Sequence, residues 1–496
     1  MSSDQPEPTD GSTAIDTAEA AVDEVVTAEV TPASTPESGT SRRATLLAAV
    51  THHRWVVAAA AVFVIARTVI IAASGSPARV PDSALFIDGA ISLSGNAAQF
   101  WPVPALFRLG GSDSGRMWLQ HLLATIAWCT LASGVAHVVR KEWLRITAVV
   151  AILVMGLAPQ VVNWDTAMLG ESIVASFAVL ATALWLWRDL ASPTVGVLTG
   201  AAALLMVCAR PTTLPLAAIL VVSGAVAAVR SGALRGRIAG GALFLLAGGG
   251  IVWMVSTLDA HDEAYRSRDD HGISFGGELA AGQLWDRMLA DDDTFVWLTD
   301  RGMPDPVDGI RPAPNNVAAA ERAATWPVFL EAASSDADWS TWLDEQGSSL
   351  AVDWALEQPV AALSGWADHS GEVLTGTAGV ETGAGAVRGV VAEVQPFFRG
   401  SGWTSDVALL FAVAAVLVLF ARRARDNGEV HRADAGAAVA AAGFVTAAAG
   451  WLLTGVEFER HAVPGPLLLR LGLVLMTVTL VDSMAPRYRE PFRTRR

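Results

Sequence analysis

Residues 192–229 read SPTVGVLTGAAALLMVCARPTTLPLAAILVVSGAVAAV, and Arg210 is the single charged residue between two apolar runs. Each run approaches the length of about 20 residues that crosses a bilayer as a helix. The rest of the chain has the same character, because 52% of its 496 residues are apolar and 17% are charged. Soluble domains carry about 25% charged residues. The sequence therefore predicts an all-α polytopic membrane protein.

Small residues dominate the apolar sequence, in which alanine, glycine, valine and leucine are the most frequent types. Membrane helices pack without a hydrophobic force between them, and small residues let their backbones approach closely. We therefore expect a compact helical bundle. Cys129 and Cys208 both fall inside apolar runs, so we expect small buried residues there and no disulfide in the polar segments.

Ten apolar windows have roughly the length of a transmembrane helix. They lie near residues 55–74, 117–138, 144–159, 169–187, 192–209, 212–229, 238–257, 405–421, 434–454 and 462–482. We expect a bundle of about ten transmembrane helices.

Basic residues fix the expected orientation, because short cytoplasmic loops of membrane proteins carry an excess of Lys and Arg. The basic clusters follow spans two, four, six, eight and ten, at Arg140, Lys141, Arg145, Arg188, Arg230, Arg235, Arg237, Arg422, Arg423, Arg425, Arg432, Arg487, Arg489, Arg493, Arg495 and Arg496. All of them lie on one side of the membrane if the chain starts inside the cell. We expect a multi-pass protein of the bacterial plasma membrane with both termini in the cytoplasm.

The expected domain organisation follows from these spans and from the polar segments between them. We expect a disordered acidic cytoplasmic tail at 1–43, transmembrane helices one to seven at 44–257 with a first outer loop at 75–116, an extracytoplasmic cap domain at 258–404, transmembrane helices eight to ten at 405–482, and a basic cytoplasmic tail at 483–496. The tail at 1–43 lacks aromatic residues and cannot bury enough apolar surface to fold. The net charge of −15 says little about partners, because the acids lie mainly in the N-terminal tail and in one long loop. We expect no nucleic-acid partner.

Two acids stand in the first outer loop, in the sequence VPDSALFIDGAIS. Asp82 and Asp88 are six residues apart, so on a helix they would point in different directions. A carboxylate at this place can act as a general base that removes a proton from an acceptor hydroxyl. Alternatively, Asp82 follows a proline and caps the N-terminus of a helix. Both interpretations remain open.

Further charged residues stand within or beside apolar sequence, where ionisable groups mark either a functional site or a pair between helices. Asp165 and Glu171 lie in NWDTAMLGES between spans three and four. Arg67, Arg210 and Arg470 lie in or next to spans. Arginine binds phosphate oxygens with two parallel hydrogen bonds, and Arg67 is placed to reach an outer-leaflet head group. Snorkelling, or pairing with Glu171, is the alternative for each arginine.

The link GVEFERHAVPGP before the last span holds Glu457, Arg460 and His461. These residues form either part of a polar site or an ordinary solvated surface. Asp291, Asp292 and Asp293 are consecutive, and a solvated loop explains them better than a divalent cation site. The sequence has no phosphate-binding glycine loop, no HExxH and no GxSxG motif. We therefore expect no cytoplasmic nucleotide-using domain and no soluble cofactor, and no motif supports a divalent metal.

Four segments together resemble the GT-C class of polytopic glycosyltransferases, which take a sugar from a polyprenyl-phosphate carrier at the outer membrane face. They are PDSALF in the first outer loop, RMWLQHLLA at the start of span two, NWDTAMLGES, and ERHAVP before the last span. The resemblance covers residues 55–230 and 434–482. Where the family often has a tyrosine after the acid, this chain has Phe86.

The resemblance implies an inverting transfer of a hexose or pentose from a lipid-linked donor to an envelope glycan or lipid acceptor. It implies Asp82 as the catalytic base, and Arg210 with Arg460 as the residues that hold the lipid phosphate. The implied substrate-binding set is Asp88, Asp165, Glu171, Arg210, Glu457, Arg460 and His461. Tryptophans of the cap either stack on sugar faces or, as we expect, fill the core of that domain. Abundant Ala, Arg and Asp with almost no Lys is typical of a GC-rich actinobacterium.

Two other functions use the same charges. The chain would be a transporter or flippase of a lipid-linked envelope precursor if the charges lined a pathway, or a non-catalytic envelope assembly protein. A transporter is expected to place ionisable residues or broken helices at matching mid-membrane positions of two repeats. Here the acids and arginines cluster at the expected outer face, where an enzyme site belongs, and Arg470 is the one charge placed near mid-membrane. That placement favours the enzyme.

Overall fold

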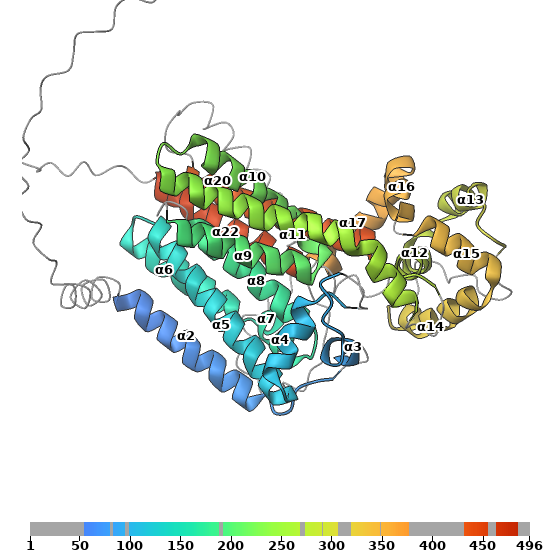
Figure 1. The fold of residues 1–496 in the computed structure, drawn as a ribbon, viewed down its shortest axis with the longest axis horizontal. Coiled ribbons are helices and arrows are strands. Elements are labelled where there is room, and N and C mark those ends of the chain that lie inside the picture. The colour runs from blue at the N-terminus through green and yellow to red at the C-terminus, as the bar shows by residue number, and fades with distance from the viewer. Residues whose placement is uncertain are drawn as a thin grey trace, which may run out of the picture. The chain divides into compact units, whose positions relative to one another are not determined.

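The computed structural model consists of helices in the part of the chain that it describes (Figure 1). The described residues are 54–79, 83–94, 99–187, 192–267, 273–289, 291–305, 319–347, 349–375, 431–454 and 463–484. Within these ranges the backbone pairing outside helices is one isolated parallel bridge between Ala78 and Ala167. The all-α prediction is thus confirmed for the described residues.

Six helices are long and apolar enough to cross a membrane. They are α2 (Arg54–Ala73), α5 (Asp113–Val138), α10 (Leu214–Arg230) together with the preceding turn η2 (Pro211–Thr213), α11 (Leu234–Arg266), α20 (His431–Leu453) and α22 (Pro464–Met484). Their length and composition support the prediction of a membrane protein.

Three of the ten expected spans are shorter helices in the structure. They are α6 (Glu142–Gly156), α8 (Glu171–Leu186) and α9 (Pro193–Ala209), with 15, 16 and 17 residues. The span expected at 405–421 and the tail expected at 1–43 lie outside the described residues. Of the tail expected at 483–496, the first two residues belong to α22 and the rest lie outside the described residues. Six helices, rather than ten, therefore have the length of a full span among the residues that the structure describes.

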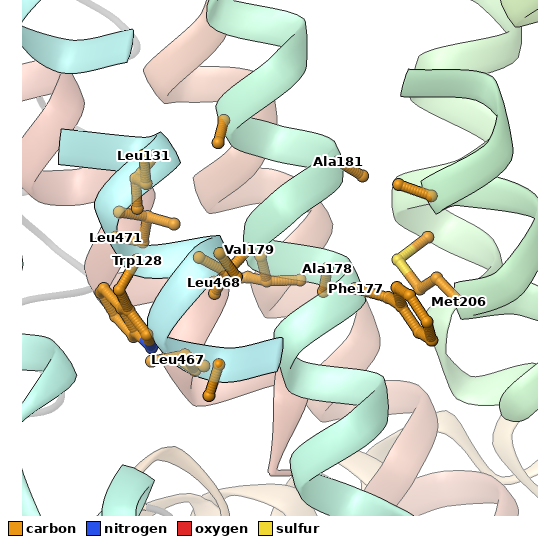
Figure 2. Close-up of a cluster of buried hydrophobic side chains, with 14 of the residues drawn as sticks. Trp128, Leu131, Phe177, Ala178, Val179, Ala181, Met206, Leu467, Leu468 and Leu471 are labelled. Carbon is orange, nitrogen blue, oxygen red and sulfur yellow. The ribbon is translucent and has the colours of Figure 1, made fainter. Parts of the chain in front are cut away.

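The central helix α8 is buried on nearly all of its faces and packs against α5, α9 and α22. Figure 2 shows side chains of these four helices in one cluster. A helix that is apolar all round is expected to lie inside a bundle. The N-terminal residue of α8, Glu171, is consequently held in the interior of the protein.

Glycines allow helices α20 and α22 to approach each other closely. A Cβ built on Gly436 would lie 2.5 Å from the backbone nitrogen of Met476, and one on Gly465 would lie 2.5 Å from that of Ala447. No real Cβ tolerates such a distance, so these two backbones touch because the residues lack side chains. The expectation that small residues let the bundle pack closely is confirmed at this pair of helices.

The segment between α11 and α17 forms a second buried cluster. Its helices are α12 (Phe275–Gln283), η3 (Leu284–Met288), α13 (Asp292–Asp300), α14 (Ala319–Ser335), α15 (Ala337–Gln346), α16 (Ser349–Glu357) and α17 (Pro359–Thr375). The buried tryptophans of the cluster are Trp285, Trp297, Trp339, Trp342 and Trp354, and Trp326 and Trp366 pack against it. The interpretation of the tryptophans as core residues therefore holds for these seven.

This second cluster is continuous with the bundle, because it includes Trp451 of α20. Arg287 lies over the Trp451 ring and donates hydrogen bonds to the backbone carbonyls of Trp451 and, at 2.8 Å, Thr454. These carbonyls belong to the last turn of α20, where backbone oxygens lack helical partners. Burial lowers the pKa of Arg287 to about 10. Arg287 thus joins the cap residues to the end of α20.

Candidate functional site

Four of the predicted site residues lie outside the described residues: Asp82, Glu457, Arg460 and His461. The structure describes the other four, Asp88, Asp165, Glu171 and Arg210. Asp165, Glu171 and Arg210 gather around the segment that joins α7 (Pro159–Thr166) to α8. Asp88 is exposed within residues 75–116, the segment that the sequence analysis expects to be the first outer loop.

Asp165 forms a buried ion pair with Arg67 of α2, and the distance from Nη2 to Oδ2 is 2.5 Å. The second carboxylate oxygen of Asp165 accepts a hydrogen bond of 2.6 Å from the Ser172 hydroxyl. Arg67 also donates to the backbone carbonyl of Gly156. Both charged side chains are completely enclosed, so Arg67 does not reach a lipid head group. Arg67 is paired, as one interpretation expected, but its partner is Asp165 and not Glu171.

Gln120 of α5 clamps the backbone of the same segment. Its Nε2 donates hydrogen bonds to the carbonyls of Asp165 (3.2 Å) and Ala167 (2.9 Å). The neighbouring His121 is buried, with Nδ1 3.9 Å from the Asp165 carboxylate and Nε2 3.4 Å from the Thr68 hydroxyl. The sequence motif RMWLQHLLA drew attention to this stretch, but it does not reveal which backbone groups Gln120 contacts.

The first outer loop is bonded to the opposite edge of this segment. The Ala78 N–H donates to the Thr166 carbonyl at 2.8 Å, and the Met168 N–H donates to the Ala78 carbonyl at 3.0 Å. Ala167 has extended backbone, so the carbonyls of Thr166 and Ala167 point to opposite sides. Consequently Gln120 approaches Ala167 from one side, and Ala78 approaches it from the other.

Helix α3 (Ser83–Ile87) and the helix after it contact the same segment. A Cβ built on Gly170 would lie 3.4 Å from the buried ring of Phe86 and 3.3 Å from Val103 of α4 (Pro102–Gly110). Helix α4 also contacts α9. The first outer loop is therefore fixed against both the α7–α8 segment and α9. Phe86 is part of that packing.

Glu171 and Arg210 form a second ion pair, with 3.2 Å between Oε1 and Nη2. Glu171 is fully buried in the first turn of α8, where the helix dipole favours a negative charge. Arg210 stands between α9 and η2, two residues after Cys208. Its Nη1 makes no hydrogen bond to any residue that the structure describes. The interpretation of Glu171 as the partner of an arginine is confirmed.

Two residues near the site escaped the sequence analysis, namely Arg79 and Asp113. Arg79 lies next to Ala78, and its Nε lies 2.6 Å from the carboxylate of Asp113, which Arg116 also contacts at 2.6 Å. The hydrogen bond and charge of Asp113 raise the pKa of Arg79 above its usual value, and Asp88 adds a smaller effect. Asp88 thus belongs to the electrostatic surroundings of Arg79.

No group of three or more His, Cys, Asp and Glu side chains is arranged to hold a metal ion within the described ranges. In the acidic run 291–293, the Asp291 carboxylate accepts hydrogen bonds from the N–H (2.8 Å) and hydroxyl (2.6 Å) of Thr294. That geometry is an N-cap of α13. It explains Asp291 without a cation.

Comparison with known proteins adds no relative: no family model, curated protein or solved structure matches this chain. The functional interpretation therefore depends on the residues themselves. The arrangement offers two buried carboxylate–guanidinium pairs, a firmly held loop, and an arginine with a spare donor.

Proposed function

We propose that the chain is a GT-C-like membrane glycosyltransferase that moves a sugar from a polyprenyl-phosphate donor to a cell-envelope glycan or lipid acceptor. One observation carries the proposal. Ala78 and Phe86, which flank Asp82 in the chain, both contact residues 166–170, the segment that leads into the Glu171–Arg210 pair. A catalytic base and a phosphate-binding arginine must act on the same donor molecule, and this packing supports their convergence.

In this proposal Asp82 accepts the proton of the acceptor hydroxyl. At the same time the oxygen of that hydroxyl forms a bond to the anomeric carbon of the donor. The bond from that carbon to the phosphate oxygen breaks, and its electron pair leaves with polyprenyl phosphate. Displacement from the opposite side inverts the anomeric configuration. Phosphate is a good leaving group, so Arg210 and Arg460 need only neutralise its charge. The spare Nη1 of Arg210 supports that role.

We do not assign Asp165 to binding the sugar. Its carboxylate is buried and occupied by Arg67 and Ser172. We assign it to ordering the α7–α8 segment. Glu171 is likewise assigned to orienting Arg210, while Asp88, Glu457 and His461 remain candidates for contacts with sugar or acceptor.

We further propose ten transmembrane helices, with both termini in the cytoplasm of a bacterial plasma membrane. In this proposal the short helices α6, α8 and α9 are also transmembrane helices. A contact between distant loops supports this arrangement, because the Asp482 carboxylate near the end of α22 accepts hydrogen bonds from the N–H groups of Arg140 (3.2 Å) and Lys141 (3.1 Å). The expected cytoplasmic ends of spans two and ten are thus neighbours.

Reconstituted vesicles with a panel of polyprenyl-phosphate hexoses and pentoses test the proposal. Asp82→Asn should lower the release of polyprenyl phosphate by about 10²–10⁴-fold, the usual contribution of a general base. Asp300→Asn is the control, because it removes an exposed acid of α13 that has no place in the proposed site. Full turnover by Asp82→Asn would refute the catalytic assignment. Movement of the donor across the bilayer without sugar transfer would favour the transporter.

A further inference from the structure

The helices α16 and α17 form one nearly continuous helical run. Backbone hydrogen bonds continue across the junction, from Gln358 to the Trp354 carbonyl (2.7 Å) and from Ala362 to the Gln358 carbonyl (3.0 Å). Pro359 stands at the first position of α17, where a helix tolerates proline. Residues of both helices can therefore be placed on common faces by helical spacing.

One face of this run packs around Trp451 near the end of α20. The ring centroids of Trp354 and Trp366 lie 6.2 and 5.6 Å from that of Trp451. Gly365 makes room for the same indole, because a Cβ built there would lie 3.3 Å from it. This face is the attachment of α16 and α17 to the bundle.

The opposite face carries an exposed apolar stripe. Val352, Leu356, Val360 and Leu363 follow one another at steps of four, four and three residues, which keeps them on one side of a helix. Leu356, Val360 and Leu363 are 74%, 80% and 68% exposed. A continuous apolar stripe of this kind on a protein surface usually marks an interaction site.

The position along α20 at which α17 makes contact indicates what covers the stripe. Trp366 also contacts Phe444, at 5.8 Å between ring centroids. Phe444 lies nine residues before the end of α20 at Leu453, which is about 14 Å along a helix. The next residue, Val445, is exposed on this candidate membrane span. Thus α17 lies beside the final turns of a candidate span, next to an exposed apolar residue of that span.

The charges around the stripe fit the same environment. Residues 358–367, QPVAALSGWA, contain no charged side chain. The nearest acid before them, Glu357, is engaged by Arg301 (2.6 Å) and by the indole N–H of Trp297 (2.9 Å). Insertion of this stretch would therefore bring no charged side chain into contact with lipid, where a charge is costly.

We infer that α17 is an interfacial helix, whose Val360 and Leu363 insert among the lipids at the membrane surface on the cap side. Leu356 lies at the boundary with water. The lipid contact holds the cap residues down against the bundle, beside the Trp451 attachment. This inference depends on the membrane class of the protein and is independent of the proposed transferase reaction.

Spin labels on single cysteines test the inference in the full-length protein, reconstituted in phosphatidylcholine–phosphatidylglycerol vesicles. The native Cys129 and Cys208 are first replaced by alanine, and gel filtration establishes that each variant is folded. Val360→Cys and Leu363→Cys receive the label. Val296→Cys on α13 is the matched control, because Val296 is 59% exposed and belongs to another cap helix.

Collision of the label with oxygen reports lipid, and collision with a water-soluble nickel chelate reports water. We expect labels at 360 and 363 to collide more often with oxygen, and the label at 296 to collide more often with the chelate. The reverse result at 360 and 363 would overturn the inference. Protection from both reagents would also overturn it, because a protein segment or a second copy of the chain would then cover the stripe.

Discussion

Arg67 of α2 and Asp165 of α7 are 98 positions apart in the sequence, yet their side chains form a buried ion pair with 2.5 Å between Nη2 and Oδ2. Asp165 is also held by Ser172. The first predicted span is thereby connected to the segment that supports the first outer loop. Long-range pairs of this kind fix how helices are arranged, although burial of two charges is costly in itself.

Removing one member of this pair should be far more harmful than removing both. Arg67→Met leaves a buried carboxylate without its partner, and we expect the free energy of unfolding to fall by about 3–5 kcal/mol. The double variant Arg67→Met with Asp165→Leu should recover much of that loss, because no buried charge remains. Thermal unfolding in detergent micelles measures both effects. Equal losses for the single and double variants would show that the pair is not energetically coupled.

The α20–α22 contact should be intolerant of a single methyl group. A Cβ built on Gly443 would lie 2.7 Å from the Gly465 carbonyl oxygen, so Gly443→Ala must push the helices apart. We expect a loss of about 1–3 kcal/mol in stability. Gly249→Ala in α11 is the control, because nothing lies within 4 Å of its Cβ position. Alanine there should be neutral or stabilising by up to about 1 kcal/mol. Similar effects at both sites would contradict close backbone packing.

Local composition was enough to predict the membrane class, the helical fold and the tryptophan core, since each depends on residues near one another in the chain. Apolar windows did not reveal helix length. The windows at 144–159 and 169–187 correspond to α6 and α8, but α6 ends at Gly156 and α8 starts after Gly170. The intervening residues form α7 and the short link that follows it. Gln120 and Ala78 form hydrogen bonds with backbone groups of residues 165–168.

The pairing of charges was only half predictable. An arginine partner for Glu171 followed from the cost of burying a lone carboxylate, but the sequence cannot choose among distant arginines. Arg67 pairs with Asp165, while Arg210 pairs with Glu171. Helix packing decides this choice, because it determines which of these side chains lie within reach of one another.

Acid should weaken the contact between α13 and α16. The hydrogen bond from Trp297, and then Arg301, lower the pKa of Glu357 below its usual 4.5. The folded state thus binds the proton less tightly than the unfolded state, so the stabilisation is present above pH 4.5 and is lost as the pH falls through the lowered pKa. Hydrogen exchange of residues 292–301 and 349–357 should accelerate below that pH relative to Glu357→Gln at the same pH. An identical pH response in the variant would contradict this assignment.

Gln120 is the residue through which stability and the proposed reaction can be separated. Gln120→Leu removes both hydrogen bonds to the carbonyls of Asp165 and Ala167, and each unpaired buried carbonyl costs about 1–3 kcal/mol. Thr125→Val is a matched change on the same helix, because the buried Thr125 hydroxyl makes no hydrogen bond to the described residues. We expect Thr125→Val to be neutral or slightly stabilising.

If the first outer loop takes its position from this segment, Gln120→Leu should lower sugar transfer even at temperatures where all of the protein is folded. The Ala78 contacts use the other edge of the same backbone, so a shift of residues 165–168 also displaces the loop that contains Asp82. Turnover per folded molecule, measured beside thermal unfolding of the same samples, distinguishes the two effects. Reduced stability with unchanged turnover would mean that Gln120 only supports the bundle. If Gln120→Leu loses both stability and turnover, and Asp82→Asn is inactive, the contacts of Gln120 are connected to the reaction.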